Sequence, residues 1–326
     1  MITPLQFHPF LRPMPWGDDR LARLLGKPVP KGQRIGESWE ISDHRLHESI
    51  VAEGSHKGRS LRSLMEEEGE TILGQAASRY RRFPWLVKFL DANDWLSVQV
   101  HPNDEQAARL SSSEGGKTEA WFVLDADPSS RIFAGLKKGV NEKKLREALA
   151  AGTVTDCLHS FEPRAGDCMF LPAGTVHAIG AGILIAELQQ NSDATFRLFD
   201  WNRRDAAGNS RPLHIEESMA CIDWTRTEVE PQFVAEYAQL LGSTPPRDVV
   251  RLLVDCSHFR IEYHGRGSPF DAGGMGNMQV WQILAGSASL GSAQLEVGQT
   301  WLLPAALPRE RCIPKPNLAL LVSTLP

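Results

Sequence analysis

Five side chains that can bind a metal or carry a charge lie on three short apolar segments of the sequence. They are, in chain order, Gln99, His101, Lys117, Glu119 and His177. Gln99 and His101 are two residues apart, as are Lys117 and Glu119, so each pair points to one face if its segment is a strand. Two imidazoles, a carboxylate and an amide oxygen can together hold a divalent metal. Because a metal with an open coordination position can do chemistry, these segments are the first candidates for an active site.

The composition is that of an ordinary globular chain. It has 326 residues, of which 42% are apolar and 23% charged, enough for one large domain or two moderate ones. The formal net charge of -5 gives no reason to expect nucleic acid or an anionic membrane as a partner. We expect neither a signal peptide nor a membrane span, because the N-terminus lacks a basic and apolar leader and no apolar run approaches ~20 residues. Five scattered cysteines outside any CxxC motif favour reduced thiols in the cytoplasm.

Most of the chain is expected to form short strands separated by Gly, Pro, Asn and Asp. The clearest candidates, rich in aromatic and β-branched residues, are 38–42, 85–90, 95–100 and 121–124. Helical spacing or capping residues predict helices over 58–68, 142–149 and 214–222. A mostly β chain with a few inserted helices indicates a sandwich or jelly roll.

One pattern of glycine, apolar strand and proline occurs twice. The first copy, residues 166–177, ends in His177, whereas the second copy, residues 298–309, ends in Arg309. We interpret this as a duplicated β unit whose second copy cannot bind metal in the same way. The polar stretch 227–247 is the expected boundary between the two units.

The first copy also has a mechanical interpretation. Gly166 begins a turn into a strand, Pro172 ends that strand, and Gly174 lets the chain reverse tightly. This reversal is expected to place His177 at the start of the returning strand, facing inward.

The glycine, proline, glycine and histidine of this copy resemble the second motif of the cupin superfamily. The first motif is altered, because Gln99-Val100-His101 stands where most cupins have His-X-His. That variant, with Glu119 after an insertion, resembles the type I phosphomannose isomerases, and the resemblance runs from Trp16-Gly17 to Trp201. It implies two cupin-type jelly-roll β units with a few inserted helices. A catalytic metal-binding domain would span 1–235, and a metal-free cupin-like domain would span 245–326.

The resemblance also implies roles for individual residues. The zinc ligands of the family correspond to His101, Glu119 and His177, with Gln99 as a fourth ligand in some members. One zinc ion per chain is implied, although this ligand set also accepts manganese, cobalt or iron. The catalytic arginine falls on Arg197, the active-site lysine on Lys117 and an acidic pocket residue on Glu187. Ser97 matches a serine of the substrate pocket, and Lys88, within an apolar strand, is a further candidate for binding substrate.

The implied activity interconverts mannose 6-phosphate and fructose 6-phosphate through a cis-enediol(ate), so a phosphorylated hexose is the expected partner. Glu187, Lys117 and a metal-bound water all remain open as the group that moves the proton, and the phosphate site is open too. Two other functions also fit: a non-haem iron cupin oxygenase, whose metal is held by the same residue types, and a non-catalytic sugar-binding cupin. The sequence does not give the oligomeric state.

Overall fold

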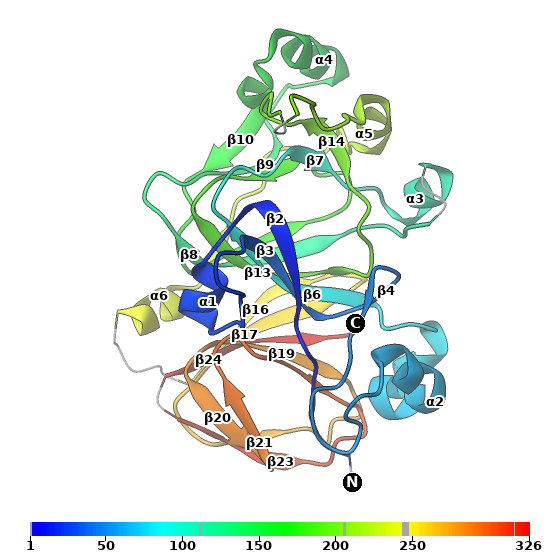
Figure 1. Cartoon of the computed structure of the whole chain (residues 1–326), viewed down its shortest axis with the longest axis vertical. Coiled ribbons are helices and arrows are strands. Elements are labelled where there is room, and N and C mark those ends of the chain that lie inside the picture. Colours follow the sequence, from blue (N-terminus) through cyan, green and yellow to red (C-terminus); the bar gives the residue numbers. More distant parts are fainter. Residues whose placement is uncertain (1, 111–112, 205–206, 243–247, 316) are drawn as a thin grey trace.

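The computed structural model shows two antiparallel β sandwiches stacked along the long axis of the molecule, which confirms the predicted fold of two jelly-roll units (Figure 1). It describes residues 2–110, 113–204, 207–242, 248–315 and 317–326. We call the sandwich formed mainly by earlier residues the first unit and the other the second unit. In Figure 1 the first unit is uppermost, and the orange and red strands of the second unit lie below it.

The first unit consists of a seven-stranded and a five-stranded sheet. The order in the seven-stranded sheet is β15 (Gln232–Phe233), β11 (Asp167–Leu171), β8 (Glu119–Ala126), β13 (Ile183–Gln190), β6 (Trp85–Ala92), β3 (Ile35–Ile41) and β2 (Phe10–Asp18). The order in the five-stranded sheet is β10 (Leu158–Phe161), β9 (Ile132–Leu136), β12 (His177–Ile179), β7 (Val98–Val100) and β14 (Phe196–Phe199).

The second unit consists of a six-stranded and a four-stranded sheet. The order in the larger sheet is β1 (Leu5–Gln6), β22 (Thr300–Leu303), β19 (Gln279–Ala285), β24 (Leu318–Thr324), β17 (Arg260–Arg266) and β16 (Val249–Asp255). The order in the smaller sheet is β18 (Phe270–Ala272), β23 (Glu310–Pro314), β20 (Ser287–Leu290) and β21 (Ala293–Glu296). A separate two-stranded ribbon pairs β4 (Asp43–His44) with β5 (His47–Glu48).

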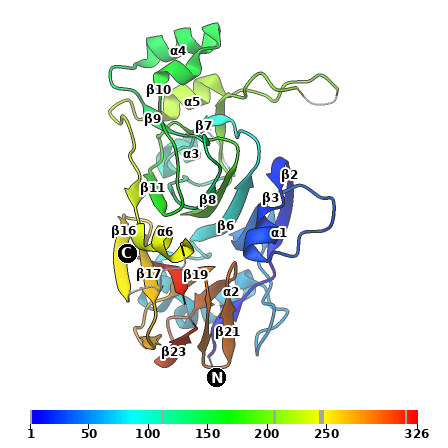
Figure 2. The same ribbon diagram turned by 90° about the vertical axis from the view of Figure 1, so that its left-hand side faces the viewer.

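The helices lie around the sheets, with α4 and α5 at the end of the first unit away from the second (Figures 1 and 2). The α-helices are α1 (Arg20–Leu25), α2 (Leu61–Leu73), α3 (Asp104–Leu110), α4 (Glu142–Ala151), α5 (Ile215–Cys221) and α6 (Ala235–Leu241); the 3-10 helices are η1 (Gly74–Arg79) and η2 (Val154–Cys157). None of these helices is both long and apolar enough to cross a membrane.

The predicted helices occur, although one begins later than expected. In α4, Asn141 accepts a hydrogen bond from the Lys144 amide and Gly152 ends the helix in the left-handed conformation. The expected helix at 58–68 instead starts at Leu61, because Ser60 is its cap and Gly58 has a φ of +84°. It then continues to Leu73.

The predicted strand at 95–100 is also shorter in the structure. Only Val98–Val100 forms β7. The carbonyls of Trp95 and Leu96 instead accept hydrogen bonds from the side chains of Arg203 and Trp201, so this stretch is held by side chains.

The central strands of the seven-stranded sheet are buried on both faces. In β6, Val87 and Phe89 point towards the second unit, whereas Lys88 and Leu90 point into the first. This alternation follows from the two-residue period of a strand, and it explains why all eight residues of β6 are buried. The outer face of this sheet is therefore apolar, and the inner face can carry charged groups.

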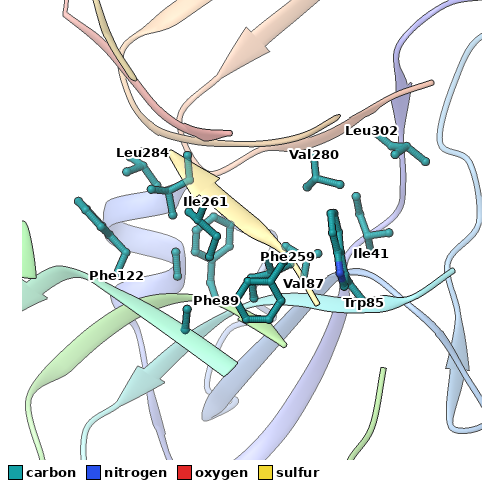
Figure 3. Close-up of a cluster of buried hydrophobic side chains, with 14 of the residues drawn as sticks. Ile41, Trp85, Val87, Phe89, Phe122, Phe259, Ile261, Val280, Leu284 and Leu302 are labelled. Atoms are coloured by element: carbon teal, nitrogen blue, oxygen red, sulfur yellow. The ribbon is translucent and has the colours of Figure 1, made fainter. Parts of the chain in front are cut away.

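The largest apolar core lies between the two units. Figure 3 shows Phe89 and Phe122 of the first unit beside Ile261, Val280 and Leu284 of the second. Strand β1 strengthens this connection, because the N-terminal segment pairs with β22 in the six-stranded sheet. The chain passes from the seven-stranded to the six-stranded sheet between β15 and β16. The second domain was predicted to begin at residue 245, which lies outside the described residues.

We predict that Phe122→Ala destabilises both units together. The Phe122 ring is stacked on Tyr263 at a centroid distance of 6.1 Å and meets the Tyr237 edge at 5.1 Å. Removing a buried phenyl ring typically costs about 3–5 kcal/mol. Denaturant unfolding should show one transition at lower denaturant, while Leu241→Ala, at an exposed site, should change it little. Two separate transitions in Phe122→Ala, with the second unit unaffected, would contradict a shared core.

Candidate active site

The five-stranded sheet aligns three polar side chains across neighbouring strands. Gln99 of β7 is paired with His177 of β12 on one side and with Arg197 of β14 on the other. Directly paired residues of antiparallel strands project from the same face. The register therefore brings together residues that are nearly 100 positions apart in the chain.

The seven-stranded sheet supplies the opposite wall. Glu187 of β13 is paired with Lys88 of β6 and with Trp121 of β8, and Glu119 is the first residue of β8. Lys117, just before β8, is buried beside this wall, whereas Ser97, just before β7, is buried on the side of the five-stranded sheet; both line the pocket. All the site residues predicted from the sequence thus lie in or beside one pocket.

Three potential metal ligands are clustered at this pocket, and one of them, Glu119, lines it. The ligand atoms of His101, Glu119 and His177 lie within 4.8 Å of one another. The two Glu119 oxygens are 3.4 Å from His101 Nε2 and 3.3 Å from His177 Nε2, and all three side chains are buried. The Gln99 amide lies 3.3 Å from His177 Nε2, so it is adjacent to the same cluster.

The backbone orients both imidazoles towards Glu119. His101 Nδ1 donates to the Ala194 carbonyl at 2.7 Å, and His177 Nδ1 donates to the Thr175 carbonyl at 2.9 Å. Each Nε2 therefore keeps its lone pair, as a metal ligand requires. Both Glu119 oxygens are buried without a well-formed hydrogen bond, although Lys117 Nζ lies 3.0 Å from Oε2, so the carboxylate can still accept a metal cation. The donor set thus fits a divalent metal.

The turn before His177 has the predicted geometry. Gly174 has a φ of +87°, and its amide donates to the His101 carbonyl at 2.9 Å. A Cβ at this position would approach Asp223 atoms at 3.0 Å, so a side chain is disfavoured there for two reasons. The turn therefore fixes the two histidine-bearing segments to each other.

Charges in the cluster keep its ligands in the forms that bind a metal. Burial, together with the Lys117 ammonium, lowers the pKa of His101 to about 3, and burial lowers the pKa of His177. Burial opposes the ionisation of Glu119, but the Lys117 ammonium outweighs it and holds the pKa of Glu119 well below its usual range. Lys117 Nζ is 3.0 Å from both His101 Nε2 and Glu119 Oε2.

A second buried ion pair lies beside the first cluster. Lys88 Nζ is 3.3 Å from Glu187 Oε2, and both side chains are almost fully buried. Burial raises the pKa of Glu187 to about 8 against the opposing effect of Lys88, and the Glu119 carboxylate adds to the increase.

The pocket has a volume of about 320 Å³, and its lining includes the cation Arg197. Arg197 Nη1 donates to the Pro212 carbonyl at 2.8 Å. Its Nε is buried without a hydrogen bond, and no carboxylate of the described chain lies within 4 Å of its guanidinium. Burial, with Arg211 nearby, lowers the pKa of Arg197, as expected for a cation that lacks full compensation.

The sequence alone did not identify four charged residues of this pocket: Arg12, Glu37, Asp193 and Arg211. Arg12 Nη1 lies 2.9 Å from Glu37 and 3.7 Å from Asp193, and its guanidinium covers the Trp39 ring at 4.6 Å. Arg211 pairs with Asp200. A signal existed for Glu37, because a carboxylate within an otherwise buried strand requires a partner.

We predict that His177→Ala abolishes stoichiometric metal binding and leaves the fold largely intact. The β core does not include the imidazole cluster, so unfolding should shift only modestly, whereas the loss of one of three protein ligands removes most of the affinity. Metal content after dialysis, together with circular dichroism, measures both effects. His159→Ala, a histidine of β10 beside Glu230, is the matched control and should keep its metal. Full metal content in His177→Ala would exclude this residue as a ligand.

Comparisons with known proteins agree with this arrangement. Residues 5–122 match the family described as "Phosphomannose isomerase type I, catalytic domain". The chain is 42% identical over 219 residues to a mannose-6-phosphate isomerase of Streptococcus mutans, covering 67% of each protein. It is 40% identical over 258 residues to mannose-6-phosphate isomerase ManA of Bacillus subtilis, covering 79% of this chain and 78% of that protein.

The fold agrees over the whole chain as well. The crystal structure of a mannose 6-phosphate isomerase from Bacillus subtilis superposes with a TM-score of 0.85 at 27% identity, covering 98% of this chain and 99% of that one. Identity and coverage of this extent leave one assignment: the chain belongs to the type I phosphomannose isomerase family.

Proposed function

We propose that this protein is a metal-dependent aldose–ketose isomerase that interconverts mannose 6-phosphate and fructose 6-phosphate. The observation that carries the proposal is that one pocket is lined both by Glu119, a member of the buried His101–Glu119–His177 cluster, and by the uncompensated cation Arg197. Family membership adds the substrate class, because the relatives in Streptococcus mutans and Bacillus subtilis are named for this sugar phosphate.

We propose one zinc ion per chain, held by His101, Glu119 and His177. Gln99 is the candidate for a fourth ligand, because its amide lies against His177 and can present its oxygen after a flip of the side chain. Two neutral imidazoles and one carboxylate leave a net positive charge on zinc, which would polarise a sugar oxygen as a Lewis acid.

The residues around the metal site would transfer the proton, stabilise negative charge and contact the sugar. Isomerisation moves a proton between C1 and C2, so a titratable group must lie in the pocket near the sugar. We favour Glu187 for this role, because its Oε1 is buried and accepts no hydrogen bond, while Lys88 holds the other oxygen. Arg197 would neutralise the enediolate oxygen or the phosphate, and Lys117 would supply a second positive charge. Ser97 lines the pocket as a contact to the sugar.

The two alternative functions have less support. An iron oxygenase requires only the two histidines and the carboxylate, and leaves the other buried charges of the pocket unexplained. A non-catalytic sugar-binding protein has no need for a second buried ion pair such as Lys88–Glu187, which costs desolvation energy. We place the reaction in the cytoplasm, since all five cysteines are free thiols.

A coupled assay for fructose 6-phosphate formation tests the proposed reaction. Metal-replete protein should convert mannose 6-phosphate, lose activity with a chelator, and regain it with zinc. Absence of turnover in metal-replete protein would favour the sugar-binding alternative. Oxygen consumption by the iron-loaded protein would favour the oxygenase.

We also predict that Arg197→Ala retains its metal and loses most of its kcat. Loss of one group that stabilises developing charge typically lowers kcat by about 10²–10³-fold. Arg146→Ala, which removes an arginine of similar size from the exposed face of α4, should be unchanged. Equal kcat values for Arg197→Ala and the unmodified protein would remove Arg197 from the mechanism.

A further inference from the structure

The two units repeat the same arrangement of strands. In the seven-stranded sheet the order β11, β8, β13, β6 and β3 corresponds to β22, β19, β24, β17 and β16 in the six-stranded sheet. The smaller sheets correspond in the same way, with β10, β9, β12 and β7 matching β21, β20, β23 and β18. The positions of the first pocket that lie on these matched strands therefore have counterparts in the second unit.

The strand register identifies those counterparts. Glu119 is paired with Leu171, and Gln279 is paired with Leu303, the residue that occupies the same place in the repeated sequence pattern. Gln279 therefore stands where the first unit has its carboxylate ligand. By the same register, Trp281 matches Trp121. With Gln279 in the place of Glu119 and Arg309 in the place of His177, two of the three candidate metal ligands have no equivalent at the matching positions.

A cavity nevertheless remains at the corresponding place. It has a volume of about 210 Å³, and its walls include Gln279, Trp281 and four residues of β17: Arg260, Glu262, His264 and Arg266. These four residues share the inner face of the second unit, because Glu262 is paired with Val322 and His264 with Leu320, two residues of the inner core. The charged residues of β17 thus line the interior of this unit.

A chain of hydrogen bonds along β17 leaves one cation unmatched. Glu262 accepts from Arg260 at 2.9 Å and from His264 Nε2 at 2.9 Å. With that tautomer, His264 Nδ1 accepts from Arg266 at 3.2 Å. Glu262 is thus already shared by two donors. The other carboxylate of the cavity, Asp271, lies 2.9 Å from Arg311, so neither carboxylate forms an ion pair with Arg266.

Arg266 is held in a position suited to an anion. Within the described part of the chain it forms no ion pair, and its Nε is buried without a hydrogen bond. Its guanidinium lies over the Phe270 ring, 4.7 Å from the centroid, which fixes the plane of the group. A planar, always charged guanidinium with an unused donor is the usual protein group for binding phosphate.

We infer that the second unit contains a metal-free binding site for a small phosphate ester of a sugar. Arg266 would bind the phosphate, and Trp281 with Gln279 would provide an apolar face and an amide for the sugar. The site would occupy the place in the second unit that the catalytic pocket occupies in the first. An arginine would bind the ligand there, and no metal would be needed. It goes beyond the isomerase reaction and does not depend on it.

The indole signal of Trp281 offers a test that is specific to this cavity. Two-dimensional NMR of the full-length, zinc-loaded protein resolves indole N–H groups, and Trp281→Phe assigns the signal. Inorganic phosphate and fructose 6-phosphate are each titrated. We expect a saturable shift of this signal, with fructose 6-phosphate binding more tightly than phosphate. Arg266→Gln should weaken both by about tenfold or more, the usual effect of losing a hydrogen bond to a charged group.

The control is Arg251→Gln, which removes an exposed arginine of β16 that pairs with Glu236 and should leave both affinities unchanged. If Arg266→Gln does not fold, Arg260→Gln removes the other cation of the cavity and should also weaken binding. The site would be overturned if neither ligand moves the Trp281 signal. It would also be overturned if the Arg266 or Arg260 variant binds both ligands as tightly as the unmodified protein does. Equal affinities for phosphate and fructose 6-phosphate would overturn the sugar component. Because the signal does not report turnover, this result is independent of the isomerase assay.

Discussion

The seven-stranded sheet is buried on both faces, and the two faces need different side chains. The rest of the structure depends on this constraint. One face packs against the second unit and has to be apolar, because that contact contains the largest core of the molecule. The opposite face is free to carry Lys88, Glu119 and Glu187, since it encloses a pocket. The strict alternation of a strand lets β6, β8 and β13 do both. A shift of register by one residue would bury these charges in the core between the units.

Burying charge has a cost that the pocket offsets by grouping ions of opposite sign. Lys117 lies beside Glu119, Lys88 beside Glu187, and Arg12 beside Glu37. Isolated buried ions would be strongly unfavourable, whereas grouped ions leave only a moderate penalty. The grouping is incomplete at Glu119 and Arg197, which keep buried atoms without partners. These two positions are where a metal and an anionic substrate would complete the electrostatics, so the site is preorganised for charge rather than for stability.

The second unit shows how one arrangement of strands supports different chemistry. Both larger sheets share their strand order and both place a tryptophan at the corresponding position, Trp121 and Trp281. The side chain two residues earlier is Glu119 in one unit and Gln279 in the other, which removes the charge that a metal requires. The second unit also supports the first physically, because its six-stranded sheet covers the outer face of the catalytic one and incorporates β1.

The sequence by itself determined the features that depend on local spacing. The paired side chains around His101 and Glu119, the glycine turn before His177, the caps of α4 and the repeated strand pattern all follow from short-range geometry, and the family resemblance supplied the other site residues. Tertiary structure alone decided which distant segments meet. Arg12, Glu37, Asp193 and Arg211 enter the pocket from separate elements, and β1 crosses to the far sheet. Pairing between strands that are remote in sequence has no signature in the local sequence pattern, because it depends on which apolar faces pack together in the folded protein.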